Sequence, residues 1–564
     1  MEPGGPPLNR LVNRRIRLFL GALVLAFAGL LLRATWLQGV RAESLSSLGR
    51  TQHRETVTIP AGRGTIYDRR GVELALGEPA TTVFANPKQI PNPRRAAVAV
   101  QRTLGVNADR IYPMLADRSR GFVYVARQAD PAQAAALKRL KLPGFGFYPE
   151  ERRDYPQGSV AAQVLGYVGV DGNGLDGTEL RFDRALAGRA GRETIVKDPS
   201  GRVIDTQTVR AEVPGKDVYL TLDHTIQANA EEVLRETVRK WSAKSASAIV
   251  LDPRTGAILA MAVQPGYDAN RFPSVPSDLQ RNRTVTDTYE PGSTFKLITV
   301  AGALSDRLVS PSTRFTLPYS LHVADRVIHD AEQRGTVNYS VAQILAHSSN
   351  IGAITLAEML GRTRLSSWIT RFGFGRTTGI DFPGESPGIV LPPDKWSGST
   401  IGNVPIGQGI AVTPVQMAAA YAAIANRGVW SRPHLVDHVA GGGRPSLYHR
   451  RLVSPRIATQ LMAMLKDVVA EGTGQYAAIP GYQVAGKTGT AQKPVSHGGY
   501  ATGRYVASFV GLVPASHPRL VVLVAVDEPR GAIWGGVVAA PAFQQIARFD
   551  LQYLEVPPDA VPTP

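Results

Sequence analysis

Cysteine is absent from this chain of 564 residues. That absence excludes catalysis by a thiol and excludes disulfide bonds, so cysteine gives no evidence for an oxidising compartment. Histidine is also scarce: ten are present, none in a His-Glu-x-x-His spacing, and neither His434 nor His438 has a glutamate beside it. We therefore expect neither a metal site nor a cofactor.

Long apolar runs are almost absent, and the one exception lies near the N-terminus. Residues 18–32 form an uncharged run of 15, whereas a transmembrane helix needs about 20 residues. Residues 34–37 extend the run if the Arg33 side chain snorkels and Trp36 lies at the interface. The alternative is a cleaved signal peptide, but neither Ala34 nor Ala42 lies in a clean Ala-x-Ala site.

Basic residues set the expected orientation of this segment. Four arginines precede the run: Arg10, Arg14, Arg15 and Arg17. Cytoplasmic flanks are enriched in such residues. We predict a cytoplasmic tail over residues 1–17, an uncleaved single-pass anchor in the cytoplasmic membrane over 18–40, and an extracytoplasmic remainder. The apolar run at 520–526 is short and β-branched, which favours a core strand over a second span.

The rest of the chain divides into two parts and a tail. Residues 44–215 mix short strands with turns, show little helical periodicity before 131–140, and hold no catalytic constellation. From residue 216 to 555 the pattern changes: apolar runs at 247–251 and 257–262 flank a turn at 252–256, which predicts a hairpin. A helical middle follows, then strands at 482–493, 507–512 and 520–526 and a final helix at 538–553. Residues 556–564 are proline-rich and predicted to be disordered.

Three short motifs occur in the order of an active-serine site. They are Ser293-Thr294-Phe295-Lys296, Ser348-Ser349-Asn350 and Lys487-Thr488-Gly489-Thr490. The first alone is weak, because a serine with lysine three positions later arises about once by chance in a chain of this length. Together they match the motif set of penicillin-binding proteins and serine β-lactamases.

The first motif has a direct physical interpretation. Pro291-Gly292 and the apolar run that follows Ser293 predict a turn that opens a buried helix. Lys296 would then lie one turn from Ser293 and could take its proton, provided that the lysine pKa is lowered. Burial and a second cation, for which Lys487 is the candidate, both lower it. The alternative is a helix lysine that snorkels to solvent.

The other two motifs are less specific when taken alone. Ser348-Ser349-Asn350 lies between two helix-like stretches and would equally fit an ordinary turn. Residues 482–493 predict an edge strand, which could pair with an extended peptide. Lys487 and a threonine would meet the peptide carboxylate, and Gly489 would leave room for a close approach.

The chain resembles a class B penicillin-binding protein, a peptidoglycan D,D-transpeptidase, well beyond these motifs. Similar blocks occur at residues 63–71, 153–156, 174–179 and 407–416, so the resemblance covers about residues 15–550. Residues 289–292, 526–529 and 535–536 are more similar to the division-specific (FtsI-type) branch than to the elongation branch. Because the chain lacks cysteine, the cysteine-based wall transpeptidases are excluded.

The resemblance implies a mixed α/β penicillin-binding transpeptidase fold. An antiparallel sheet enclosed by helices (216–555) would follow a β-rich pedestal or dimerisation domain (44–215) and one transmembrane helix. It implies catalytic roles for Ser293, Lys296, Ser348, Asn350 and Lys487, and substrate binding by Thr488, Gly489 and Thr490. The backbone N–H groups of Ser293 and Thr490 would stabilise the oxyanion.

The implied reaction is the cross-linking of stem peptides that end in D-Ala-D-Ala, through an acyl-enzyme on Ser293 that β-lactams also form. Ser349 replaces the Asp of class A β-lactamases, and no deacylating Glu/Asn loop occurs between Asn350 and Lys487; both favour a penicillin target over a penicillinase. The alternatives are an elongation-specific transpeptidase, a β-lactam sensor, and a scaffold that activates a membrane-embedded wall polymerase.

The net charge of +17 is large, and residues 1–17 account for only +3 of it, from four arginines and one glutamate. The remainder suits anionic lipid headgroups or wall polymers. Nucleic acid is not expected, because the chain has an anchor and no basic–aromatic repeat. The expected partners are stem peptides, β-lactams, the lipid bilayer, a lipid II polymerase and other division proteins.

Overall fold

The computed structural model describes residues 8–41, 54–197, 203–444, 446–495 and 499–560. Parts of the predicted tails and the start of the predicted pedestal (1–7, 44–53 and 561–564) lie outside the described residues. The chain forms two compact units. One comprises Met1–Ala61 with Arg189–Pro214, and the other comprises Gly62–Gly188 with Gly215–Pro564.

The first unit holds a long helix and a small sheet. Helix α1 (Leu8–Thr35) continues into the π-helical turn η1 (Trp36–Val40). Among the described residues, this is the one helix long and apolar enough to cross a membrane, over Asn13–Val40. Its large apolar side chains are exposed, including Phe19 and Leu25 at 74% each, which lipid would cover. The sheet has the order β1 (Arg54–Ile59), β6 (Gly191–Lys197), β7 (Val203–Arg210).

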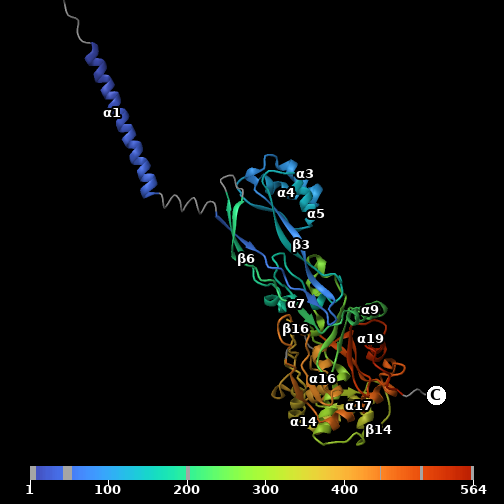
Figure 1. Ribbon diagram of the computed structural model, residues 1–564. Coiled ribbons are helices and arrows are strands. Elements are labelled where there is room, and N and C mark those ends of the chain that lie inside the picture. The colour runs from blue at the N-terminus through green and yellow to red at the C-terminus, as the bar shows by residue number, and fades with distance from the viewer. Residues whose placement is uncertain (1–7, 42–53, 198–202, 445, 496–498, 561–564) are drawn as a thin grey trace, which may run out of the picture. The chain divides into compact units, whose positions relative to one another are not determined.

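The second unit begins with a mixed sheet. Its order is β16 (Val436–Val439), β8 (Val218–Leu220), β2 (Ile66–Tyr67), β3 (Glu73–Ala85), β4 (Val123–Ala129), and β5 (Phe145–Asp154) also pairs with β3. Helices α3 (Pro93–Leu104), α4 (Ala108–Ala116) and α5 (Pro131–Arg139) cluster near one end of β3 (Figure 1). Three short helices follow: α6 (Ala162–Leu165), α7 (Gly177–Arg181) and α8 (Asp183–Leu186).

Two of these helices contradict the expectation of little helix before residue 131. Helix α3 has the boundary residues of a helix: the Asn92 side chain accepts a hydrogen bond from the Arg95 N–H, Pro93 follows it, and Gly105 ends the helix at φ 71°. The apolar face of α3 consists mainly of alanine, and these small side chains give only a weak helical periodicity of hydrophobicity in the sequence.

The core of the second unit is an antiparallel sheet with the order β10-β9-β20-β19-β18. Its strands are β9 (Ser245–Leu251), β10 (Ile258–Gln264), β18 (Ala485–Pro494), β19 (Tyr500–Val513) and β20 (Leu520–Asp527). The early hairpin therefore pairs with the late strands, through β9 and β20, as predicted. The strand that carries Lys487–Thr490 lies at the edge of this sheet, also as predicted.

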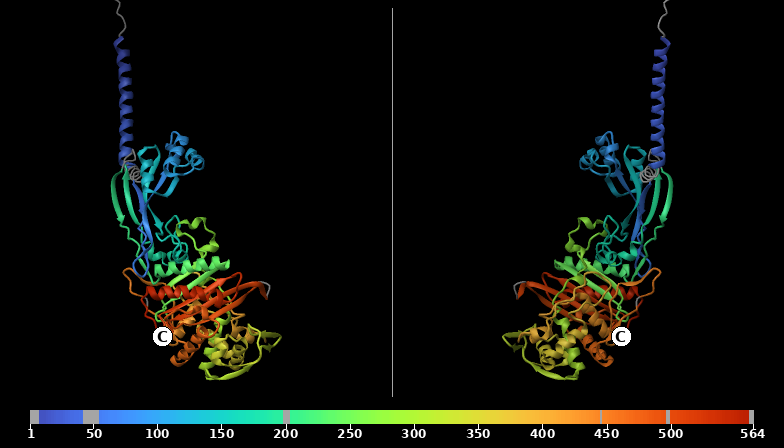
Figure 2. Two further views of the ribbon diagram at one scale, coloured as in Figure 1. Left: turned by 90° about the vertical axis from the view of Figure 1, so that its right-hand side faces the viewer. Right: turned by 90° about the vertical axis from the view of Figure 1, so that its left-hand side faces the viewer.

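Helices cover both faces of this sheet (Figure 2). Ala246, Ala248 and Val250 of β9 pack in one apolar cluster with α9 (His224–Trp241) and α19 (Ala540–Tyr553). The alternate residues Ile249 and Leu251 pack in a second cluster. That cluster includes α12 (Lys296–Ser305), α14 (Asn350–Phe372), α16 (Pro414–Ala425) and α17 (Pro455–Ala470). Alternation along the strand thus builds two cores, and the predicted mixed α/β fold is confirmed.

Shorter elements complete the unit. The helices are α10 (Ser277–Gln280), α11 (Arg283–Thr286), α13 (Val341–Ala346), α15 (Thr400–Asn403) and α18 (Gly535–Val538), with 3₁₀ turns η2 (Pro87–Gln89), η3 (Ala269–Ser274), η4 (Gly292–Phe295), η5 (Pro393–Lys395), η6 (Val404–Ile406) and η7 (Gln475–Ala477). Three two-stranded antiparallel sheets are β11 (Arg314–Leu317) with β14 (Val337–Ser340), β12 (Ser320–Val323) with β13 (Arg326–His329), and β15 (Val429–Ser431) with β17 (His449–Arg451).

Candidate active site

The serine of the first motif lies in the turn η4, directly before α12. Lys296 begins α12, and its side chain is fully buried, with Nζ 3.0 Å from Ser293 Oγ. Gly292 has φ 55°, and a Cβ added there would lie 2.8 Å from the Thr490 carbonyl oxygen. The serine turn and β18 therefore meet backbone to backbone, which only glycine permits here.

Burial sets the protonation state of Lys296. It lowers the pKa of this amine to about 7, against the opposing attraction of Asp330. The amine is therefore substantially neutral near pH 7 and available as a base beside the Ser293 hydroxyl. The sequence predicted that the Lys487 cation lowers the pKa of Lys296. The structure shows the converse influence: burial, and then the Lys296 cation, hold the pKa of Lys487 well below its usual range.

Ser348 lies between the two lysines. Its Oγ is 3.2 Å from Lys296 Nζ and 3.0 Å from Lys487 Nζ. Its backbone adopts φ 59°, in the left-handed region, which costs a residue other than glycine about 1–3 kcal/mol. This hydroxyl joins the two buried amines into one proton path.

Asn350 completes this group from the first turn of α14. Its Oδ1 accepts a hydrogen bond from Lys296 Nζ at 2.7 Å, and its Nδ2 donates to the His329 carbonyl at 2.8 Å. The second bond fixes the amide orientation, so that oxygen rather than nitrogen faces the lysine.

Asp330 is a functional candidate that the motifs did not reveal. It is buried, and its carboxylate accepts hydrogen bonds from Ser349 Oγ at 3.1 Å, from the Asn350 N–H at 2.5 Å and from the Ile351 N–H at 3.1 Å. Arg334 pairs with the same carboxylate. Asp330 follows β13 and lies 20 residues before Asn350, so no local sequence pattern marks this contact.

The third motif is held by its neighbours in β18 and beyond. Lys487 Nζ lies 3.3 Å from Thr488 Oγ1, and Thr488 Oγ1 lies 2.7 Å from Thr473 Oγ1. Thr490 Oγ1 accepts a hydrogen bond from the Gly535 N–H at 3.0 Å. In this structure the Thr490 hydroxyl thus contacts the start of α18, and among the described residues it makes no hydrogen bond to Lys296 or Lys487.

Gly489 also makes a close approach within the protein itself. A Cβ at this position would lie 2.3 Å from Ser508 Oγ and 2.8 Å from the Pro291 carbonyl oxygen. The close approach is therefore made by the neighbouring strand and by the serine turn. The structure brings Ser293, Lys296, Ser348, Asn350 and Lys487 into one contact chain, which Thr488 extends.

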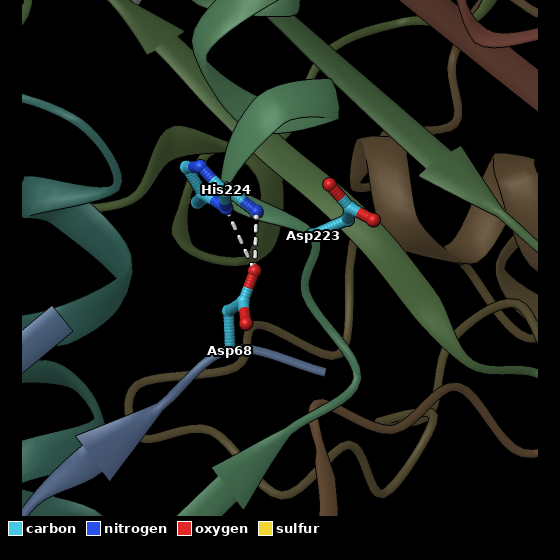
Figure 3. A group of neighbouring side chains, drawn as sticks. All are labelled: Asp68, Asp223 and His224. Carbon is cyan, nitrogen blue, oxygen red and sulfur yellow. Dashed lines mark hydrogen bonds and ion pairs between the residues drawn. The ribbon is translucent and has the colours of Figure 1, made fainter. Parts of the chain in front are cut away.

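A second polar cluster lies elsewhere in this unit and consists of Asp68, Asp223 and His224, whose ligand-type atoms lie within 4.8 Å of one another (Figure 3). Asp68 Oδ2 accepts hydrogen bonds from the His224 N–H and lies 2.8 Å from Nδ1. Asp223 Oδ1 caps α9 at the Thr225 N–H, and Oδ2 lies 3.3 Å from Arg70 Nε. Both carboxylates are thus engaged by protein groups, and the cluster links the turn at Asp68 to the N-terminus of α9.

Comparison with known proteins agrees with this geometry. Residues 246–548 match the penicillin binding protein transpeptidase domain, and residues 58–220 match the penicillin-binding protein dimerisation domain. The chain therefore belongs to the penicillin-binding proteins with a transpeptidase domain. It is a penicillin-binding transpeptidase enzyme of the class B architecture and is similar to FtsI-type proteins, as the motifs predicted.

The similar proteins match over nearly their full length. The chain is 34% identical to the peptidoglycan D,D-transpeptidase FtsI of Escherichia coli, over 98% of this chain and 94% of the relative. It is 34% identical to stage V sporulation protein D of Bacillus subtilis, over 98% and 87%. The crystal structure of penicillin binding protein 3 from Mycobacterium tuberculosis in complex with ampicillin has 30% identity and a TM-score of 0.71, over 90% of this chain and 98% of the other.

Proposed function

We propose that this transpeptidase cross-links peptidoglycan stem peptides during septal wall synthesis, through an acyl-enzyme on Ser293. The observation that carries the proposal is the buried amine of Lys296, 3.0 Å from Ser293 Oγ and with a pKa of about 7. A serine hydroxyl needs such a base to become a nucleophile.

In the first half-reaction, Lys296 takes the Ser293 proton as Oγ attacks the carbonyl carbon between the two terminal D-alanines. The carbonyl oxygen becomes an oxyanion, which the backbone N–H groups of Ser293 and Thr490 stabilise; one such donor contributes about 3–4 kcal/mol elsewhere. The C–N bond then breaks, and the leaving D-alanine receives the proton by way of Ser348. The product is an ester on Ser293.

In the second half-reaction, the amine of a neighbouring stem peptide attacks the ester carbonyl. Its proton passes to Lys296 and then to Ser293 Oγ as the C–O bond breaks, which restores the enzyme and leaves the new peptide bond. Asn350, Lys487 and Thr488 would hold the donor peptide, together with Gly489 and Thr490 along the outer edge of β18. That edge has no strand partner among the described residues, which suits pairing with an extended peptide.

We further propose the surroundings in which this reaction occurs. Helix α1 would anchor the chain once in the cytoplasmic membrane, with the arginines before it inside and the catalytic unit outside. The assignment of residues 44–215 to a pedestal and of 216–555 to the enzyme is supported by the two family matches, which cover 58–220 and 246–548 and so overlap most of each range. A lipid II polymerase and other division proteins are the proposed partners.

Covalent inhibition by β-lactams is part of the same proposal, and relatives in complexes with aztreonam and ampicillin support it. The test is the intact mass of the full-length protein in detergent after incubation with benzylpenicillin. We expect one stable adduct on the wild type, none on Ser293→Ala, and an unchanged adduct on Ser305→Ala, a serine at the far end of α12. Rapid loss of the adduct with drug turnover would indicate a hydrolase instead.

The septal role needs a test in cells. Filamentous cells after depletion would support division, whereas rounded cells would support the elongation-specific alternative. If Ser293→Ala restored growth to depleted cells, the protein would instead act as a scaffold, chiefly by activating a polymerase.

A further inference from the structure

Two adjoining hollows lie near the C-terminal end of α14, apart from the catalytic residues at its start. The larger is shallow and open to solvent, has a volume of about 590 Å³, and is lined by Arg371, Arg376 and Arg450 together with hydroxyl side chains from α14. The smaller, of about 200 Å³, shares Arg376 and Arg450 and adds Thr378. We call this surface the three-arginine site.

The charge at this surface is uncompensated. Neither hollow is lined by an aspartate or a glutamate. The nearby Glu385 is engaged elsewhere, because its carboxylate accepts hydrogen bonds from the Thr378 N–H and hydroxyl and from the Gly379 N–H. Across the described residues, none of the three guanidinium groups has an ion pair or a hydrogen bond to a protein group.

Aromatic rings hold two of the three cations in place. The Arg450 guanidinium lies 4.9 Å from the centroid of the Trp430 ring, and that of Arg371 lies 5.0 Å from the centroid of Trp368. Burial lowers the pKa of Arg450, and the Arg376 and Arg371 cations lower it further, against the opposing influence of Tyr448. Arg371 and Arg376 are exposed and Arg450 is half-buried, so the three positive charges repel one another at the surface without a counter-charge between them.

We infer that the three-arginine site binds a phosphate group of a ligand distinct from the stem-peptide substrate. Guanidinium groups bind phosphate oxygens in pairs of parallel hydrogen bonds, and three of them match a group that carries close to two negative charges. The hydroxyls of Ser366 and Ser367, which line the larger hollow, can supply further donors. A carboxylate would neutralise one of the three charges and leave the repulsion between the others.

The chemistry fits two sources, a soluble phosphorylated compound or the headgroup of an anionic lipid. Three probes separate them: inorganic pyrophosphate, glycerophosphoglycerol, and dihexanoyl-phosphatidylglycerol below its micelle concentration. Calorimetry on the full-length protein in nanodiscs of neutral lipid would measure the affinity for each. The variants are Arg376→Ala, the double variant Arg371→Ala/Arg376→Ala, and as a matched control Arg456→Ala, an exposed arginine on α17 that lines neither hollow.

We expect saturable binding of pyrophosphate that weakens about 10-fold in Arg376→Ala and about 100-fold in the double variant, because each charge-assisted contact is lost. Arg456→Ala should bind as the wild type does, and binding should weaken with added salt. Binding of the short-chain lipid alone, with the same loss in the variants, would assign the site to a lipid headgroup. Equal affinity of the wild type and the double variant for all three probes would overturn the inference. Benzylpenicillin acylation should be unchanged in every variant, which separates this test from that of the active site.

Discussion

Two groups of buried basic side chains in the second unit differ in whether a carboxylate contacts the basic group. At the active site, Lys296 and Lys487 are fully buried and contact hydroxyl, amide and carbonyl oxygens. In the amino-terminal part of the unit, Arg63 and Arg153 are also buried, but both contact the carboxylate of Glu179, at 2.7 and 2.6 Å.

The two groups therefore have opposite electrostatic outcomes. Burial lowers the pKa of Lys296 to about 7, and Asp330 opposes this only from a distance, since no carboxylate among the described residues contacts the amine. Burial would also lower the pKa of Arg63, but attraction to Glu179 and hydrogen bonds to Asp183 and Glu179 raise it above its ordinary value. A counter-charge in contact keeps a buried cation charged and structural, whereas its absence yields a neutral, reactive amine.

The largest expected effect is on catalysis at Lys296. Lys296→Met should slow acylation by benzylpenicillin at least about 1000-fold, since the general base is lost. The same substitution should raise the midpoint of thermal unfolding, because a buried amine that must lose its proton on folding is replaced by an apolar chain. Stopped-flow acylation and calorimetry measure the two quantities. A lower unfolding midpoint would show that the lysine is instead a structural cation.

The next largest effect is on stability at Glu179. Glu179→Gln should lower the free energy of unfolding by about 3–5 kcal/mol, because two buried guanidinium groups lose their shared counter-charge. Glu78→Gln, which removes a half-exposed partner of Arg152, is the control and should cost at most about 1 kcal/mol. Urea unfolding of both variants gives the comparison, and equal costs would refute the distinction drawn above.

Asp550 extends the comparison to a buried acid. Both of its carboxylate oxygens are buried without a hydrogen-bond partner among the described residues, and burial, then Asp223, raises its pKa well above the usual value. The folded state then holds a proton that the unfolded state loses above about pH 4, so stability should fall by up to about 1.4 kcal/mol per pH unit as pH rises from there. Asp550→Asn should remove this slope. Unfolding measured from pH 4 to 7 tests it, and an unchanged slope would show that Asp550 is ionised.

The smallest expected effect is a shift in pH dependence at Asp330. This carboxylate raises the pKa of Lys296, so Asp330→Asn should move the acid limb of acylation to lower pH, by less than about one unit. The maximal rate should also fall, because the start of α14 loses an acceptor. Asp325→Asn, an exposed aspartate between β12 and β13, is the matched control and should leave the limb in place. A fall in rate without a pH shift would limit Asp330 to a purely structural role.

These cases show which parts of the molecule the sequence could predict. The three motifs predicted which residues meet, because the chemistry requires particular residue types at a fixed local spacing around Ser293 and Lys487. The hairpin and late strands followed from their β-branched runs. The helix α3 was missed because its buried face is mostly alanine, and Asp330 was missed because about 20 residues, including β14 and α13, separate it from its partners at the start of α14. The protonation of Lys296 depends on burial, which only the folded chain determines.

The backbone contact between the serine turn and β18 has a consequence for drug resistance, if β-lactams inhibit this enzyme as proposed. Gly292 and Gly489 leave no space for a side chain. A substitution at either glycine would therefore push the serine turn and β18 apart and abolish the activity of the enzyme. Populations under β-lactam selection should therefore leave both glycines intact. Their adaptive changes should accumulate around the β12–β13 hairpin and Asp330 directly after it. This carboxylate contacts Ser349 and the Asn350 N–H, so changes there alter the second motif while the catalytic residues stay the same.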